Sequence, residues 1–535
     1  MLKKFTQIFN VTNHQITKIF IRHNEKIFYP YLNNIRPHNN AIILMELNNL
    51  HSSHIAYSYL GAVLAKKFNA NLVAYSPLLF DSLLRRTFIR IKKFINVHEF
   101  AVYRSFGIKK FIIPNISEDI KKSAAAVYES IYKKLNSKYD IENISIKKVW
   151  VGDLIYDTYL RRFNEPTIEK DSLKFKNFLK EMVEQFFFWD HFFSIHNIKA
   201  INVSHCVYNL AIPLRIALSR NIPAFQSNFN YIYRLNKKNM FAYNDFYSYK
   251  DSFSALTRKT QKVGVDLAKN QIKRRFFGEI GVDMQYSTKS AYSSLRYKKL
   301  IINSPRVKIL IATHCFFDSP HSYGKNIFPD FYEWLDFLGE ISCQTDYDWY
   351  IKTHPDYLPG TMKIIEYFIA KYPKFRLLPS NASHHQIIEE GIDFALTTYG
   401  TIGFEYAALG IPVINASLNN PHVAFDFNLH PKNLREYKKI LFRLDKIKFK
   451  PNRNSVYEYY FMKHIFYNTN IFTDDMEYSN KKLIESSFQF SPMFYNFWVE
   501  SFSLKNHNKT ISEIIKFIAS KEFRFTKKNF GVVYE

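Results

Sequence analysis

A segment rich in glycine and threonine has the residue types of an anion-binding turn. It reads Thr-Tyr-Gly-Thr-Ile-Gly-Phe-Glu from Thr398 to Glu405, follows a predicted apolar strand, and is predicted to open a helix near Thr401. Gly400 and Gly403 carry no side chain where an anion would approach the backbone, and the first N–H groups of a helix carry the positive end of its dipole. Thr398 and Thr401 add hydroxyl donors. The alternative is that these are the small residues of any strand-to-helix turn.

A lysine and a histidine end another predicted strand upstream. Lys352 and His354 are two positions apart, so they project to the same side of an extended chain, and Pro355 stops the strand. A lysine offers an anion a point charge, and a histidine offers a hydrogen-bond donor or a proton. The alternative is a His-Pro pair that only shapes a turn.

A third predicted strand, which starts at Val307, also releases polar residues at its end. His314 follows the strand directly, and Asp318 and His321 come a few residues later. Ligands of open parallel sheets bind beyond the carboxyl ends of the strands. The repeated polar strand ends therefore predict one binding site, with His314 on the anion side and Asp318 and His321 on the side of a second substrate.

Candidate proton acceptors follow strands predicted in the first half of the chain. Glu46 ends the first strand, His51 follows it, and Asp153 and His205 each come directly after a later strand. If both sheets turn these edges toward one cleft, Glu46, Asp153 or His205 can act as a general base, with His51 nearby. Each candidate base has an alternative role: Asp153 as a helix cap, His205 as an interior histidine, and Glu46 as the partner of a lysine or arginine.

The charge and cysteine content restrict the classes of protein to consider. The chain has 535 residues, with 74 Lys and Arg against 47 Asp and Glu and a formal net charge of +27. This surplus attracts an acidic polymer or a lipid surface, although clusters such as Lys273-Arg274-Arg275 are short and are expected to be solvated. Three widely spaced cysteines argue against a disulfide framework or a cysteine-based zinc site and favour a reducing cytoplasm. No signal peptide or membrane span is predicted, so we expect at most peripheral contact with the inner face of the membrane.

The order of the predicted elements indicates an α/β protein with two domains. Strands alternate with helical segments in both halves, as in parallel sheets covered on both faces. We predict two Rossmann-like, doubly wound parallel-sheet domains that face a cleft, with a helical C-terminal tail. The predicted divisions are an N-terminal extension at 1–40, a first domain at 41–290, a second domain at 300–430 and a C-terminal extension at 431–535. Strands of the first half are predicted at 41–47, 71–75, 110–113, 147–152, 200–204 and near 224.

These motifs resemble those of bacterial surface-polysaccharide glycosyltransferases of the GT-B type, broadly the capsule-synthesis transferases. The resemblance is carried by Lys352-Thr-His-Pro355, by the segment 398–405 with 408–412, and more loosely by 152–161 and 204–208. It implies that the first domain binds the acceptor and the second binds a CMP-, UDP- or GDP-linked sugar donor. It places His354 and Thr401 against the donor nucleotide and Glu405 against its ribose. The alternative for Glu405 is a favourable interaction with the helix dipole.

The resemblance also implies catalysis without a bound metal or other cofactor, because basic residues and a helix N-terminus neutralise the leaving nucleotide. Asp346-Tyr-Asp348 has the pattern of a metal-binding pair, but it starts the strand whose far end carries Lys352, so we expect a solvated strand start on the opposite edge. The expected reaction transfers a sugar to a hydroxyl of a saccharide or lipid-linked acceptor, and no specific nucleic acid is involved. Two alternatives stay open: a sugar-nucleotide epimerase of the same fold, and a non-enzymatic basic protein that binds an anionic polymer or membrane.

Overall fold

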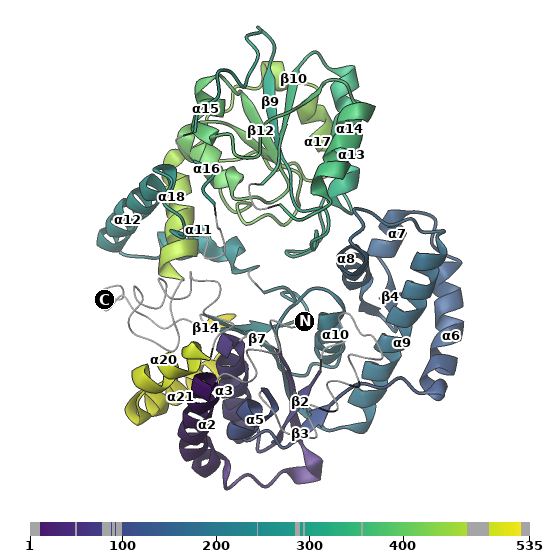
Figure 1. The fold of residues 1–535 in the computed structure, drawn as a ribbon, viewed down its shortest axis with the longest axis vertical. Coiled ribbons are helices and arrows are strands. Elements are labelled where there is room, and N and C mark those ends of the chain that lie inside the picture. The colour runs from purple at the N-terminus through teal and green to yellow at the C-terminus, as the bar shows by residue number, and fades with distance from the viewer. Residues whose placement is uncertain are drawn as a thin grey trace.

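Two separate β-sheets, each covered by helices on both faces, form the two halves of the protein (Figure 1). The computed structural model describes residues 11–48, 51–76, 87, 91, 99–229, 231–242, 244–283, 289–292, 295–354, 357–467 and 492–525. The predicted α/β class is confirmed, with Rossmann-like parallel sheets and a helical C-terminal region.

The first sheet has the strand order β14-β8-β7-β6-β1-β2-β3. The five strands from β7 to β3 are parallel, whereas β8 and β14 are added antiparallel at one edge. The strands are β1 (Ile42–Glu46), β2 (Asn71–Tyr75), β3 (Lys110–Ile112), β6 (Ile198–Val203), β7 (Ala224–Ser227), β8 (Ile232–Leu235) and β14 (Arg524–Phe525).

Alternate residues of β1 pack into two different cores, because successive side chains of a strand point to opposite faces. Ile43 and Met45 belong to one cluster, and Ile42 and Leu44 belong to the other. The first cluster is covered by α2 (Val11–Leu32), α3 (His51–Lys67), α5 (Glu99–Ser105), α20 (Met493–Ser501) and α21 (Leu504–Ala519). The second is covered by α6 (Glu118–Tyr132), α7 (Lys138–Glu142), α8 (Gly152–Phe163), α9 (Leu173–Ile195) and α10 (Ile212–Ser219).

The second sheet is entirely parallel, in the order β11-β10-β9-β12-β13. Its strands are β9 (Lys308–Ala312), β10 (Asp348–Lys352), β11 (Phe375–Leu377), β12 (Phe394–Thr397) and β13 (Val413–Asn415). Ile309 and Ile311 pack toward α13 (Phe331–Gln344), α14 (Thr361–Lys371) and α17 (Leu434–Leu441). Leu310 packs toward α15 (His384–Glu389) and α16 (Ile402–Leu409).

The chain returns to the first half after it completes the second. Helices α11 (Tyr249–Ser254), α12 (Arg258–Phe276) and α18 (Arg453–Tyr460) and the π-helical turn η5 (Phe461–Phe466) share one core with α16. Further along, α20 contacts α2, α21 contacts α3, and β14 joins the first sheet. The short 3-10 helices are η1 (His38–Asn40), η2 (Asn209–Ala211), η3 (Asn244–Ser248) and η4 (Leu444–Lys446).

The strand predicted at 147–152 is not part of the parallel sheet, and this prediction was wrong. The segment forms a small hairpin of β4 (Ser145–Ile146) and β5 (Val149–Trp150), and α8 begins at Gly152. Lys147 and Lys148 have φ values of 49° and 65°, as both central residues of a tight type I′ hairpin turn require. The short apolar run after the two lysines has the same residue pattern as a buried strand, which explains the wrong prediction.

Within the described part of the chain, none of the helices combines the length and the apolar character needed to cross a bilayer.

Gly152 offers a test of the close packing between α8 and the C-terminal end of α7. A Cβ atom at this position would collide with the backbone carbonyl oxygens of Ile141 and Glu142, which cannot rotate away. We expect Gly152→Ala to lower the unfolding free energy by about 1–3 kcal/mol, the usual cost of overpacking, and to lower the melting temperature in a thermal scan.

Gly61→Ala is the matched control, because its Cβ would meet only the flexible ends of Leu72 and Met45, at 3.0 and 3.2 Å. A Gly152→Ala protein that melts at or above the temperature of Gly61→Ala would contradict this packing.

Candidate functional site

The turn between β12 and α16 presents backbone N–H groups at the carboxyl edge of the second sheet. The amides of Gly403 and Phe404 donate to the carbonyl oxygens of Gly400 and Thr401, at 3.0 and 3.1 Å. The amides of Thr401 and Ile402 donate to no backbone carbonyl of a described residue. Because the first N–H groups of a helix lack intrahelical partners and carry partial positive charge, this turn can bind an anion.

His314 supports this turn from its inner side. Its Nε2 atom accepts a hydrogen bond from the amide of Thr398 at 3.2 Å and lies 3.0 Å from Oγ1 of Thr397. Its ring stacks on Phe331 with centroids 4.7 Å apart. Burial lowers the pKa of His314 to about 3, so the ring is neutral and its Nδ1 carries the proton. His314 therefore holds the turn in place and does not supply a positive charge.

The two glycines of the turn are explained by packing inside the protein. A Cβ atom at Gly400 would lie 2.8 Å from Oγ1 of Thr397, and one at Gly403 would collide with the ring of His422. Gly403 therefore makes room for an internal histidine, which differs from the predicted role of exposing backbone to an anion.

Cationic and hydroxyl groups lie at the ends of β10 and β12, which flank β9 in the sheet. The buried ammonium of Lys352 donates to the carbonyl of Ser380 at 2.9 Å. Burial lowers the pKa of Lys352 to about 8, while the nearby carboxylate of Glu405 opposes this shift. His354 is exposed, and Pro355 lies outside the described residues.

Two hydroxyls at this edge are buried without a hydrogen-bond partner in the described structure. They belong to Thr353, next to Lys352, and to Thr398, in the turn. A buried polar group without a partner costs roughly 1–3 kcal/mol, so such groups need an explanation. A bound ligand or water that reaches this edge would satisfy both.

Glu405 is held by residues from a distant part of the chain. Its carboxylate accepts hydrogen bonds from Arg275 at 2.5 Å and from the Tyr292 hydroxyl at 2.7 Å. Burial opposes ionisation, but Arg275 and hydrogen bonds from Thr401 and Tyr292 hold the pKa of Glu405 below its usual value. Arg275 also pairs with Asp283, so this residue is an exception to the solvated surface expected for most of the charges.

A hydrogen-bonded chain leads from Glu46 to an exposed histidine at the edge of the first sheet. The buried carboxylate of Glu46 accepts from the amide of Ser204 at 2.9 Å and from its hydroxyl. Oγ of Ser204 lies 2.8 Å from Nδ1 of His205. Since the single hydroxyl proton of Ser204 goes to Glu46, Nδ1 of His205 must donate, which leaves Nε2 with a free lone pair.

Two pKa shifts fit a proton-accepting role for His205. Burial raises the pKa of Glu46 to about 7, although its bonds with Ser204 oppose the shift. Desolvation by the surrounding protein lowers the pKa of His205, with Asp318 acting in the opposite direction, and the residue keeps an exposed surface. A neutral, accessible imidazole with an oriented lone pair can act as a general base.

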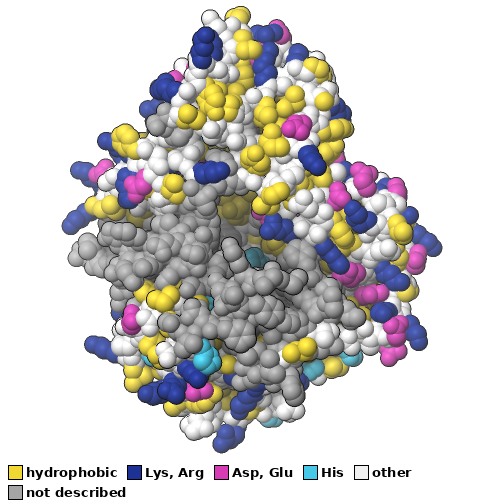
Figure 2. Space-filling model, in the orientation of Figure 1, with side chains coloured by type: hydrophobic (Ala, Val, Ile, Leu, Met, Phe, Trp, Pro, Cys, Tyr) yellow, Lys and Arg dark blue, Asp and Glu magenta, His cyan; other side chains and the backbone are white. Residues whose placement is uncertain are grey.

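Asp318 brings the edges of the two sheets together. This exposed carboxylate accepts from the hydroxyl of Tyr208 at 2.6 Å, and its charge raises the pKa of both His205 and His314. Tyr208 adopts φ 58° and ψ 180°, a backbone conformation that costs a non-glycine residue energy and is concentrated at functional sites. The hollow between the two halves is visible in Figure 2.

Three predicted site residues have other roles in the structure. Asp153 is buried, and Arg215 binds both of its carboxylate oxygens, at 2.5 and 3.3 Å, so it is not available as a base. It also lies at the start of α8, away from the parallel sheet. His51 packs beside Tyr495 of α20 with ring centroids 4.8 Å apart.

His321 is fully buried between the two halves and is therefore not on an open acceptor surface. Its Nδ1 lies 2.5 Å from Asp157 of α8, and its Nε2 lies 3.1 Å from Glu142 of α7. Burial alone would lower the pKa of His321, but the two carboxylates raise it to about 10, so the ring is protonated. Nearby, the Tyr156 hydroxyl donates to Asp330 at 2.5 Å across the same interface.

The Asp346 and Asp348 pair lies at the opposite end of β10 from Lys352, as its place in the strand indicates. Asp348 is buried rather than solvated. Its carboxylate is bound by Ser304 at 2.5 Å, Arg306 at 3.0 Å and Arg376 at 2.9 Å. Two arginines and a serine therefore occupy the oxygens that a metal ion would need.

Several residues of the site were not predicted, because their signals are not local. Ser204 and Tyr208 lie in the segment 204–208, which carries the resemblance only loosely and gave them no role. Tyr292 is an ordinary loop residue in the sequence, and Arg275 looks like one member of a basic cluster. Ser204 has one further sequence signal, which is its position directly before the candidate base His205.

No family model matches the chain, and no curated protein matches it. Among solved structures, it is similar to a beta Kdo 2,4 transferase, KpsC, of Thermosulfurimonas dismutans, with 11% identity and a TM-score of 0.30 over 49% of this chain and 79% of that chain. It is also similar to a glycosyltransferase from Rickettsia africae, with 11% identity and a TM-score of 0.21 over 91% and 100% of the two chains. A putative UDP-N-acetylglucosamine 2-epimerase from Listeria monocytogenes has 11% identity and a TM-score of 0.23 over 84% and 97%. TM-scores of this size carry no argument about function.

The ion pairs of His321 with Asp157 and Glu142, called the His321 bridge below, make the stability of the folded protein depend on pH. The His321 pKa of about 10 in the folded protein exceeds the ordinary value of 6.5, so its stabilising contribution is complete below pH 6.5 and is lost as the pH rises through about 10. We expect His321→Gln to lower the unfolding free energy by about 3–5 kcal/mol at pH 7, because two carboxylates lose their buried partner. Thermal scans from pH 6 to 10 measure the effect.

The exposed His191 provides the control variant His191→Gln. The melting temperature of the wild type and of this control should fall more steeply between pH 7 and 10 than that of His321→Gln. Equal melting temperatures and equal pH slopes in all three proteins would contradict the bridge.

Proposed function

We propose that this protein is a glycosyltransferase of GT-B type that moves a sugar from a nucleotide-activated donor to a hydroxyl of a saccharide or lipid-linked acceptor in surface-polysaccharide synthesis. The observation that carries the proposal is the position of Asp318. It is close enough to influence both the proton-accepting His205 of the first half and the His314 that supports the anion-binding turn of the second half. A base and an anion site that face one hollow match the needs of group transfer from a phosphorylated donor.

The donor phosphates bind at the turn before α16 in this proposal. The free amides of Thr401 and Ile402 and the helix dipole neutralise the leaving phosphate, and Lys352 and His354 add positive charge or a proton. The hydroxyls of Thr353 and Thr398 gain the partners that they lack in the described structure. These groups replace a metal ion as the source of positive charge, so the proposed reaction needs no metal.

Glu405 accepts hydrogen bonds from the donor ribose in this proposal, and this requires a rearrangement. Arg275 and Tyr292 already occupy its carboxylate oxygens. A ribose hydroxyl therefore has to share the carboxylate with them or displace Tyr292, whose bond is the longer of the two.

Nε2 of His205 removes the proton from the acceptor hydroxyl. Ser204 fixes the tautomer of the imidazole, and Glu46 fixes Ser204, so Glu46 is a positioning residue. In this proposal the enzyme works at the inner face of the membrane, where it meets lipid-linked acceptors. The net charge of +27, which attracts anionic lipid, supports this location.

The donor site is tested by nucleotide binding. We expect His354→Ala and Glu405→Ala each to weaken the binding of UDP, CMP or GDP, whichever the wild type binds, by roughly tenfold, which is about 1.4 kcal/mol. Isothermal titration calorimetry measures the affinity, and a melting curve confirms that the Glu405 variant is folded. Exposed His191→Ala is the control. Unchanged affinity in both variants would remove the donor site from the proposal.

The base is tested by the pH dependence of the rate. His205→Ala should lower kcat by about 10²–10⁴-fold without changing nucleotide affinity, since the loss concerns only proton transfer. Because the pKa of His205 is lowered, the wild-type rate should fall only as the pH drops below its usual value of 6.5. Glu46→Gln should lower kcat less and shift this acidic limb.

Product analysis separates the proposal from its alternatives. The transferase needs an acceptor, so incubation with the donor alone should leave the sugar unchanged. Epimerised sugar in that incubation would identify an epimerase. Salt-sensitive binding to an anionic polymer or to vesicles, without any nucleotide affinity, would identify a non-enzymatic binding protein.

A further inference from the structure

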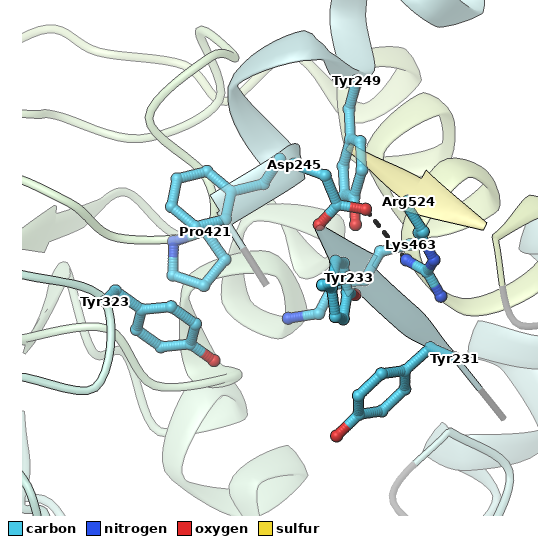
Figure 3. A pocket seen from close by; sticks show the side chains of 9 residues that line it. Tyr231, Tyr233, Asp245, Tyr249, Tyr323, Pro421, Lys463 and Arg524 are labelled. Atoms are coloured by element: carbon cyan, nitrogen blue, oxygen red, sulfur yellow. Dashed lines mark hydrogen bonds and ion pairs between the residues drawn. The ribbon is translucent and has the colours of Figure 1, made fainter. Parts of the chain in front are cut away.

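A cavity of about 130 Å³ lies where the two halves and the C-terminal segment meet (Figure 3). Tyr231 and Tyr233 line it from the first sheet, Tyr249 from α11, and Tyr323 from the loop after β9. Lys463 of the π-helical turn η5 and Arg524 of β14 complete the polar part of the wall, together with Asp245. Four tyrosines around two cations form an unusual composition for a cavity wall.

The charges in this cavity do not balance. Arg524 pairs with Asp245 at 2.9 Å, but Lys463 forms no hydrogen bond or ion pair with any described residue. In Figure 3, the ammonium of Lys463 extends into the space bordered by Tyr233 and Tyr323. Burial lowers the pKa of Lys463 to about 8, although Asp245 and Asp283 oppose this, so the ammonium is mostly charged at pH 7 and is poorly compensated. The Nζ atom of Lys463 lies 5.6 Å from the centre of the Tyr459 ring, a cation–π contact. A poorly solvated cation without an ion pair still favours an anionic partner.

The backbone geometry at Lys463 is of a kind found at functional sites. This residue lies in a π-helical turn that directly continues α18. Such turns are rare in proteins, and many of those that occur are at functional sites.

The cavity is adjacent to the proposed donor turn. The ring of Tyr323 packs edge-on against Tyr399 with centroids 5.3 Å apart, and Tyr399 lies 4.8 Å from His314. Since Tyr399 belongs to the turn at 398–401, the cavity wall contacts this turn directly. A ligand in the cavity would lie within reach of a sugar attached to a phosphate at that turn.

We propose that this cavity binds one sugar unit of the acceptor, and that this unit carries a carboxylate or phosphate group which pairs with Lys463. Tyrosine rings offer apolar faces to the C–H groups of a sugar ring, and their hydroxyls offer hydrogen bonds. Charge-assisted hydrogen bonds to an ammonium are about twice as strong as neutral ones, so Lys463 selects anionic units. A cavity of about 150 Å³ holds benzene, so a cavity of about 130 Å³ has room for the ring of one sugar unit and not for a longer saccharide. The assignment to the acceptor rests on the proposed function, whereas the binding of an anionic sugar does not.

The experiment uses the full chain and three probes of similar shape, which are glucuronic acid, glucose 6-phosphate and glucose. We expect titration calorimetry or ligand-observed NMR to detect at least one of the two anionic probes, bound at least roughly tenfold more tightly than glucose. Preference for one anionic probe identifies the anionic group as a carboxylate or a phosphate. Equal affinity for glucose and both anions would overturn the proposal.

Two variants separate this cavity from the donor site. Lys463→Met keeps the length of the side chain and should reduce the affinity for the anionic probe to that for glucose, whereas Lys450→Met, at an exposed position, should not. Melting curves confirm that both variants are folded. Retained affinity in Lys463→Met would overturn the proposal.

Nucleotide binding distinguishes the two sites further. Lys463→Met should bind the nucleotide like the wild type, and His354→Ala should bind the anionic sugar like the wild type. If Lys463→Met loses nucleotide affinity, the cavity is part of the donor site and the acceptor assignment is wrong. If no nucleotide binds but the anionic sugar does, the proposed function fails while the sugar site stands.

Discussion

A buried imidazolium between two carboxylates fixes how the two halves of the molecule face each other. His321 belongs to the second half, and Asp157 and Glu142 belong to the first. Removing three charged groups from water is costly, and the cost is recovered only when the geometry of the ion pairs is good. The bridge therefore tolerates little displacement. Since Asp318 lies in the same loop, the bridge also holds Asp318 against Tyr208 and keeps the two sheet edges close.

Two of three histidines at the interface are neutral with the proton on Nδ1, and the third is charged, because their hydrogen-bond partners differ. His314 accepts from a backbone amide and is neutral, with its proton on Nδ1. His205 is neutral with a lone pair on Nε2, because Ser204 accepts from its Nδ1. His321 is positively charged between two acids. One residue type thus provides a support for the turn, a candidate base and a structural ion pair.

The positive charge that is available near the site is more localised than the net charge suggests. Many arginines are used internally, as Arg275 binds Glu405 and Asp283, and Arg215 binds Asp153. What remains near the hollow is a set of backbone amides, the ammonium of Lys352 and exposed His354. Polar hydroxyls without partners, at Thr353 and Thr398, mark the same edge. The anion binding that we propose at this edge thus depends on the N-terminal end of α16 more than on bulk charge.

The sequence by itself determined the two parallel sheets, most of their strands and the polar strand ends, because alternation, apolar runs and Gly or Pro boundaries are local signals. It missed the antiparallel strands β8 and β14 and misplaced the strand at 147–152, where pairing partners decide the outcome. Only the tertiary structure decided the roles of the charged residues. Asp153 meets Arg215 across 62 positions, Glu405 meets Arg275 across 130, and His321 meets Asp157 across 164. No local pattern reports such pairs, because the ionic state of a buried group is set by whichever distant side chain the fold brings to it.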